Sequence, residues 1–134
     1  MTELKKIVKQ VHDAYDRYIR AVDQHHQAKE AVLDRKLMNK AHEMSFVLEG
    51  IPGKNQGERD AWLANEMSDA YQLQSALEAK ERFAAHVVTI TKLEVDRIQW
   101  KVRALELIAK AEDSEQTWEE VAAEVIDQEQ EVIQ

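Results

Sequence analysis

The chain has no cysteine, a single proline and three glycines among its 134 residues, and only 6% of the residues are aromatic. Without cysteine, a disulfide-stapled fold and any site built on thiolates, such as a zinc–cysteine or iron–sulfur centre, are excluded. Glycine and proline together are far rarer than in average proteins, where glycine alone accounts for about 7%. Because a sheet protein needs frequent turns, this scarcity predicts an all-helical fold.

Long apolar runs are also lacking. None approaches the roughly 18 residues of a membrane span, and the first six residues have none of the features of a signal peptide. The formal net charge of −8 argues against a general affinity for nucleic acid or anionic membranes. We therefore expect a cytoplasmic protein that does not bind membranes.

Every glycine and the only proline fall within residues 50–57. Gly50 suits a left-handed helix cap, and Pro52 cannot continue the helix that ends there. Asn55 and Glu58 have the spacing of a capping box, in which two side chains satisfy backbone N–H groups of a first helical turn. The residues assigned to this turn and its caps are Gly50, Pro52, Gly53, Asn55 and Glu58.

Uninterrupted helical patterns flank the turn and predict a long antiparallel hairpin of the coiled-coil type, with helices at about 3–49 and 58–111. In the second helix a single register of alternating four- and three-residue steps predicts the seam. Its members are Leu63, Met67, Ala70, Gln74, Leu77, Glu81, Ala84, Val88, Thr91, Val95, Ile98, Val102, Leu105 and Ala109. In the first helix the apolar stripe changes phase across residues 25–32, which predicts a kink or a local unwinding there. The two parts of that stripe are Leu4, Val8, Val11, Tyr15, Tyr18 and Val22, then Leu33, Leu37, Ala41, Met44 and Leu48.

The second helix carries more apolar residues than one seam can bury. Leaving several large side chains in water is costly, because each contributes roughly 1.5–3 kcal/mol when it is buried. We therefore expect self-association into an oligomeric helical bundle. The residues predicted to form the oligomer interface are Phe83, Ile90, Leu93, Trp100 and Leu107.

Residues 112–134 differ in character from the rest of the chain. They contain nine acidic residues and no lysine or arginine, and they predict a short acidic helix after a break near 111–114, capped by Ser114 or Thr117. The basic residues cluster at the opposite end of the hairpin from the turn, where they form a candidate polyanion patch. Its members are Lys5, Lys6, Lys9, Arg97, Lys101, Arg103 and Lys110. Three interpretations stay open: a binding patch, a solvated face, or a surface on which the acidic helix folds.

Polar residues offer little for catalysis. Asp23 and His26 have the acid-x-x-His spacing of di-metal helical bundles, but no second such pair follows. Gln74 and Glu81 lie in the predicted seam, either as a polar cluster with His42 or His86 or as residues that set the register. No phosphate loop, nucleophile elbow or dinucleotide fingerprint is present. We expect no enzymatic activity, no metal and no organic cofactor.

Two segments resemble a known group of proteins: 53–63, which reads GKNQGERDAWL, and 93–105, which reads LEVDRIQWKVRAL. They are similar to a loose group of small helical phage and prophage proteins that share a G-x-N-x-x-E-R-x-A-x-L turn before a long helix. The resemblance covers about residues 48–108. In that group the genes are often neighbours of recombination and single-strand-binding genes, and no activity is established. The resemblance implies a viral or prophage origin, the host cytoplasm as location, and work near DNA transactions.

The preferred hypothesis is a non-enzymatic phage-type accessory or adaptor protein that acts through helical oligomerisation and protein–protein contacts. Its expected partners are a second copy of itself and an unidentified protein. One alternative is a nucleic-acid-associated factor that uses the basic end of the hairpin, although the net charge and the lack of an aromatic stacking platform disfavour it. Another is an inhibitor of a host defence protein.

Overall fold

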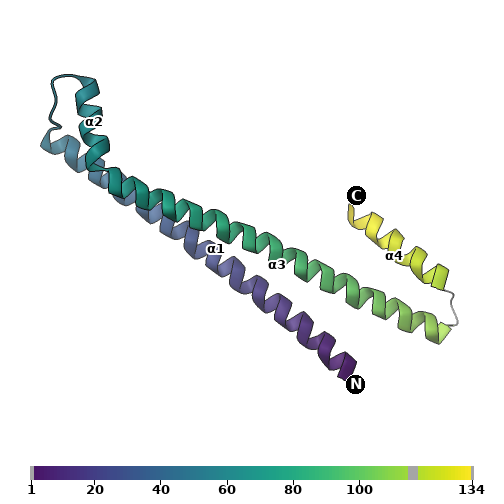
Figure 1. Ribbon diagram of the computed structural model, residues 1–134. Coiled ribbons are helices and arrows are strands. Elements are labelled where there is room, and N and C mark those ends of the chain that lie inside the picture. Colours follow the sequence, from purple (N-terminus) through teal and green to yellow (C-terminus); the bar gives the residue numbers. More distant parts are fainter. Residues whose placement is uncertain (1, 115–117, 134) are drawn as a thin grey trace. The chain divides into compact units, whose positions relative to one another are not determined.

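The computed structural model describes residues 2–114 and 118–133, which form four helices and no strand. The helices are α1 (Thr2–Glu49), α2 (Gln56–Glu66), α3 (Ser68–Ser114) and α4 (Trp118–Ile133). The long helix α1 packs against α3 as a helical hairpin (Figure 1). The predicted all-helical hairpin is therefore confirmed.

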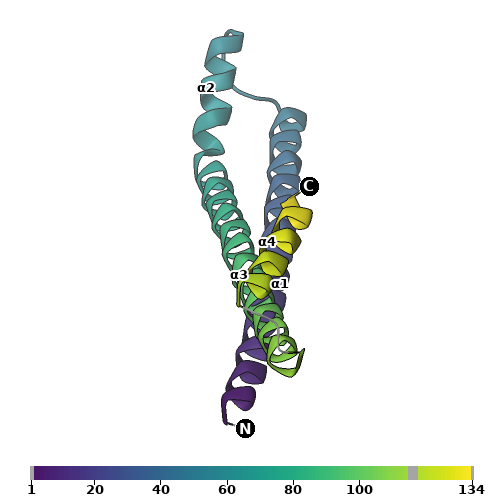
Figure 2. The ribbon, with the colours of Figure 1, turned by 90° about the vertical axis from the view of Figure 1, so that its right-hand side faces the viewer.

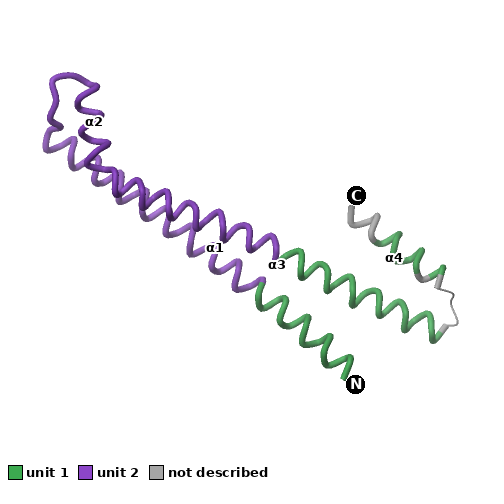
Figure 3. The backbone as a smooth tube through the Cα atoms, viewed as in Figure 1, with its two compact units in different colours: residues 1–17, 91–134 green, residues 18–90 purple. Residues whose placement is uncertain are grey.

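Two compact units make up the chain (Figure 3). Unit 1 contains residues 1–17 and 91–134, and unit 2 contains residues 18–90. Each unit thus includes a part of α1 and a part of α3, and α4 belongs to unit 1. The division follows the packing of the helices, whereas the sequence separates residues 1–111 from 112–134 by charge.

The turn begins where two glycines adopt backbone conformations that side chains disfavour. Gly50 has φ 96° and its N–H donates to the carbonyl of Phe46 at 3.1 Å, which closes the last turn of α1. Gly53 has φ 142°, and a Cβ placed there would lie 2.9 Å from both the backbone nitrogen and Cγ of Arg59. The predicted C-cap and turn are therefore confirmed.

The start of α2 is held by side chains on both sides of the turn. The Asn55 side-chain oxygen accepts the N–H of Glu58 at 2.9 Å, and the Glu58 carboxylate accepts the N–H of Lys54 at 2.7 Å. Phe46 and Trp62 then meet edge to face, with ring centroids 5.3 Å apart, across the open loop seen in Figure 2. The predicted cap at Asn55 is confirmed, with the difference that Glu58 reaches one residue further back than in a capping box.

The expectation of one continuous helix at 58–111 is wrong at Met67, which separates α2 from α3. Met67 has φ −91° and ψ 1°, and its N–H still bonds to the Leu63 carbonyl at 2.9 Å, so the helix bends there without unravelling (Figure 1). The Met67 side chain is only 1% exposed. At the other end α3 continues to Ser114, so Ser114 does not cap α4, and Thr117 lies outside the described residues.

The predicted local unwinding of α1 is also wrong, because a single α-helix runs through residues 25–32, whereas the alternative of a kink stays a prediction. Buried and half-buried residues recur along α1 in one unbroken register of four- and three-residue steps. The members are Val11, Ala14, Tyr18, Ala21, His25, Ala28, Val32, Arg35 and Asn39. Small side chains such as Ala14 and Ala21 let two helices approach closely, whereas a row of leucines would hold them apart.

The larger apolar residues of α1 consequently lie outside the seam. Leu33, Leu37 and Leu48 are 60%, 65% and 81% exposed, although the sequence pattern places them at the helix contact. On α3 the predicted seam is confirmed from Met67 to Val102, where its members are buried or half-buried. Beyond that point Leu105 is 39% exposed, because the buried face of α3 turns toward α4.

Several polar contacts join α1 to α3 within unit 1. Arg17 and Glu94 form a two-pronged ion pair, and this hydrogen bond raises the pKa of the Arg17 guanidinium above its ordinary value. The Gln99 side chain donates to the Tyr15 hydroxyl. The Lys101 ammonium donates to the Gln10 side-chain oxygen at 3.4 Å.

Candidate functional sites along the hairpin

The most buried polar residue of the hairpin is Asn39, which is 2% exposed in the seam of unit 2. Its amide nitrogen donates to the Gln74 side-chain oxygen at 2.9 Å and to the Ala70 carbonyl at 3.3 Å. Its side-chain oxygen accepts the Arg35 Nε–H at 3.1 Å. Both amide hydrogens and the oxygen are therefore engaged, which is what a buried amide requires.

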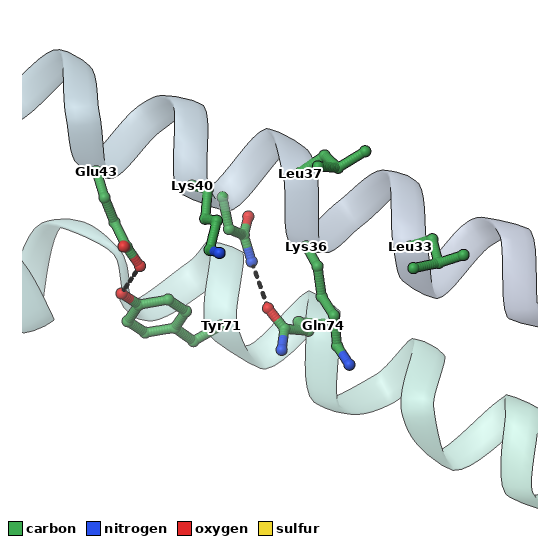
Figure 4. A pocket seen from close by; sticks show the side chains of 8 residues that line it. Leu33, Lys36, Leu37, Lys40, Glu43, Tyr71 and Gln74 are labelled. Atoms are coloured by element: carbon green, nitrogen blue, oxygen red, sulfur yellow. Dashed lines mark hydrogen bonds between the residues drawn. The ribbon is translucent and has the colours of Figure 1, made fainter.

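The network continues along α3 and borders a groove of about 480 Å³ (Figure 4). Gln74 donates to the Glu78 carboxylate at 3.0 Å, and the Lys36 ammonium lies 3.9 Å from the same carboxylate. Next to it the Tyr71 hydroxyl donates to the Glu43 carboxylate. This hydrogen bond, followed by burial and by the negative charge of Glu43, raises the pKa of Tyr71 above its ordinary value.

We call these linked residues the Asn39 network; they are Arg35, Lys36, Asn39, Gln74 and Glu78. The sequence predicts Gln74 as a polar seam residue, and the structure gives it Asn39 as a partner, while His42 and His86 are exposed. Glu81 is half-buried, in line with its seam position. The position of Asn39 could have been found by extending one register from Val11 onward instead of following the largest side chains.

A second groove, of about 390 Å³, lies between α1 and α3 in unit 2, and we call it the alanine groove. Ala28 and Ala31 line it from α1, and Ala84 lines it from α3. The remaining lining residues are Gln24, Gln27, Leu77, Lys80 and Phe83. The Phe83 side chain is 70% exposed, the highest value of any large apolar residue described on α3.

The residues predicted to form an oligomer interface do not share one environment. Phe83, Ile90 and Leu93 are 70%, 50% and 60% exposed, so they are accessible to a partner. Trp100 is half-buried. Leu107 is only 3% exposed, because it clusters with Ala111 and packs against Ile108 and the α4 residue Val125. The expectation that Leu107 lies on a free face is therefore wrong.

The seven residues of the candidate polyanion patch are all exposed, and all belong to unit 1. The contact between Lys101 and Gln10 brings the end of α3 beside the start of α1, as the hairpin predicts. The acidic helix α4 also reaches this region, since Arg103 donates to Gln128 at 2.9 Å. Of the three interpretations, the contact favours α4 folding back onto the hairpin, through an amide and an apolar cluster.

The histidines are dispersed. His26 pairs with Glu30 at 3.2 Å, and Asp23 accepts a hydrogen bond from Gln27 at 3.0 Å. Across residues 2–114 and 118–133, no three histidine, aspartate or glutamate side chains are grouped so that they could hold a metal ion. The absence of a metal in the working protein stays a prediction.

Comparisons with protein-family models, curated proteins and solved structures find no match for this chain. None of the helices in the described part of the chain combines the length and the apolar character needed to cross a bilayer.

Proposed function

We propose that this chain is a non-enzymatic accessory or adaptor protein that works by self-association and by helical contacts with another protein. The supporting observation is the distribution of its apolar side chains. Within the described residues only seven hydrophobic residues are buried, whereas eighteen large ones are exposed. Such a surplus is typical of a surface that another protein covers.

Eleven of these exposed residues lie on α1 alone. They include Leu4 and Val8 near its start and Met44 and Leu48 near its end, all more than half exposed. Most of them are separated by three, four, seven or eleven residues, as residues on one face of a helix are. A two-helix hairpin cannot bury such a face, and we assign it to the helical contact with another protein.

The resemblance of residues 48–108 to small phage and prophage proteins supports placing this function in a phage or prophage, near DNA recombination or replication. This part of the proposal depends on the turn signature alone. The turn residues Gly53, Asn55 and Glu58 act in the structure as conformational and capping residues. They therefore account for the shared motif by helix chemistry without a ligand.

Light scattering coupled to size-exclusion chromatography tests self-association directly. We expect a mass of at least twice the 15.5 kDa of one chain at micromolar concentration. A mass of one chain across the whole concentration range would contradict the proposal. Affinity capture from the native host then identifies the second partner, with the double variant Leu33→Glu/Leu37→Glu as a control that places charge on the exposed face of α1.

A second candidate function is nucleic-acid binding at the basic patch, with the acidic helix competing for it. The hydrogen bond from Arg103 to Gln128 of α4 supports the competing part of this candidate, because it brings the acidic helix beside the patch. Deleting residues 112–134 removes nine acidic residues, and we expect longer retention on heparin or single-stranded DNA if α4 masks the patch. The gain should fall steeply with salt, because such binding is driven by counterion release. Equal retention of the full-length and shortened chains at low salt would contradict masking.

A further inference from the structure

The alanine groove and Phe83 are suited to each other in size. A phenyl ring needs little room, since an apolar cavity of about 150 Å³ binds benzene. The groove of about 390 Å³ exceeds this, and its alanine side chains leave the space open. Phe83 stands at the edge of the groove with 70% of its surface exposed, so it does not fill the groove of its own chain.

A projecting ring and an open groove on one surface meet the condition for a symmetric dimer, in which the same patch serves both subunits. We infer that the alanine groove is the docking site for Phe83 of a second copy of this chain. A twofold axis passing close to Phe83 places each ring in the groove of the other copy. This inference rests on the proposed self-association and names the surface that carries it.

The exposed area around Phe83 is large enough for such an interface. Leu73 and Ile90 lie ten and seven residues from Phe83, on the same helix flank, and are 45% and 50% exposed. With Phe83 they offer roughly 300 Å² of apolar surface, given about 150–250 Å² for a whole aromatic side chain. A standard interface buries about 800 Å² per partner, of which a little over half is apolar. Three side chains thus supply most of the apolar part.

The charges near the groove favour a second copy over a charged partner. Lys80 is the one charged residue among those that line the groove. The polar residues at its edge, Gln24 and Gln27, carry neutral amides. The same amides of a second copy can lie opposite them without charge repulsion. The Asn39 network groove, in contrast, is lined by Lys36, Lys40 and Glu43. Two copies that meet through the alanine groove therefore bring together few like charges.

Truncation of the ring is the first test. We expect Phe83→Ala to raise the dimer dissociation constant about 100-fold or more, because two rings are lost per dimer and each tenfold corresponds to about 1.4 kcal/mol. Analytical ultracentrifugation over a concentration series measures the constant. The matched control is Leu33→Ala, a truncation of a side chain that is 60% exposed and lines the other groove. It should change the constant less than threefold.

Filling the groove is the second test. Ala31→Leu should weaken the dimer by blocking the entry of the ring, and this effect should disappear when the variant already carries Phe83→Ala. Additive effects of the two substitutions would overturn the proposed contact. If the wild-type chain associates and neither substitution weakens it, the surface is wrong while self-association stands. If the wild-type chain is monomeric at every concentration, both proposals fail.

Discussion

Leu107 and Phe83 lie on the same helix, α3, yet their surroundings differ completely. Leu107 is 3% exposed, because Val125 of α4 closes over its cluster. Phe83 is 70% exposed, and in unit 2 no helix covers it. A surplus of apolar residues on a hairpin can therefore be covered by the same chain or left for another. The negative charge of α4 does not determine which residues are covered, because the residues that α4 covers are apolar.

The largest effect is expected at a side chain that is covered completely. Met67→Ala should lower the free energy of unfolding by about 2–5 kcal/mol, since Met67 is 1% exposed and its truncation leaves a cavity at the bend between α2 and α3. The matched control is Met44→Ala, at a methionine that is 61% exposed, with an expected change of about 0.5 kcal/mol or less. Urea unfolding at one fixed protein concentration measures both variants. Equal costs would break the distinction between covered and uncovered residues.

The next largest effect concerns Leu107, which α4 covers. Leu107→Ala should cost about 2 kcal/mol and should also speed amide exchange in α4, because the cluster of Leu107, Ala111 and Val125 holds that helix. Leu105→Ala is the control on the same helix, at a leucine that is 39% exposed. Hydrogen exchange read by mass spectrometry reports on α4. Unchanged exchange in Leu107→Ala would show that α4 is held by something else.

A smaller effect separates polar from apolar burial. Asn39→Ala should destabilise the hairpin by about 1–2 kcal/mol, because it leaves the side-chain oxygen of Gln74 and the carbonyl of Ala70, both in half-buried residues, without their donor. Asn65→Ala removes an exposed asparagine and serves as the control. Thermal unfolding at constant concentration is sufficient to rank the two. A cost no greater than that of Asn65→Ala would mean that water replaces the missing donor.

The smallest effect is the pH dependence of the contact between Tyr71 and Glu43. The pKa of Tyr71 is raised in the folded chain, so its contribution is complete below the ordinary tyrosine pKa of about 10 and is lost as pH rises through the raised value. We expect about 0.5 kcal/mol or less, since the side chains are partly in water. Tyr71→Phe should remove this alkaline dependence. In Glu43→Gln, ultraviolet titration should show Tyr71 ionising at lower pH.

The sequence predicts the hairpin and its turn well, because Gly50, Pro52 and Asn55 act through local backbone geometry. It predicts the α3 seam for the same kind of reason, since one register holds from Met67 to Val102. It misplaces the inner face of α1, because the prediction assigns the largest apolar residues to the seam. The close approach of the two helices requires small side chains there, and alanine supplies them. The burial of Leu107 could not be read from its own helix, since it depends on a separate helix folding back.

The Asn39 network is a further case of a feature that local patterns hide. Asn39 belongs to the α1 register, but an asparagine among alanines and valines does not reveal its partner. That partner, Gln74, is 35 residues away and becomes adjacent only when the hairpin closes. The alanine groove is hidden for a similar reason, because it needs small residues from both helices at one level.

The position of the turn has a consequence for the order of folding. Phe46 and Trp62 are 16 residues apart, whereas Tyr15 and Gln99 are separated by 84. Closing the longer segment first would cost about 1.5 kcal/mol more in chain entropy. We expect the two long helices to pair from the turn outward, so that the hydrogen bond from Asn39 to Gln74 forms early. A hairpin that closes in a shifted register would bury the Asn39 side chain without the Gln74 oxygen that accepts its hydrogen bond. Such a register is therefore disfavoured before the rest of the two long helices has paired.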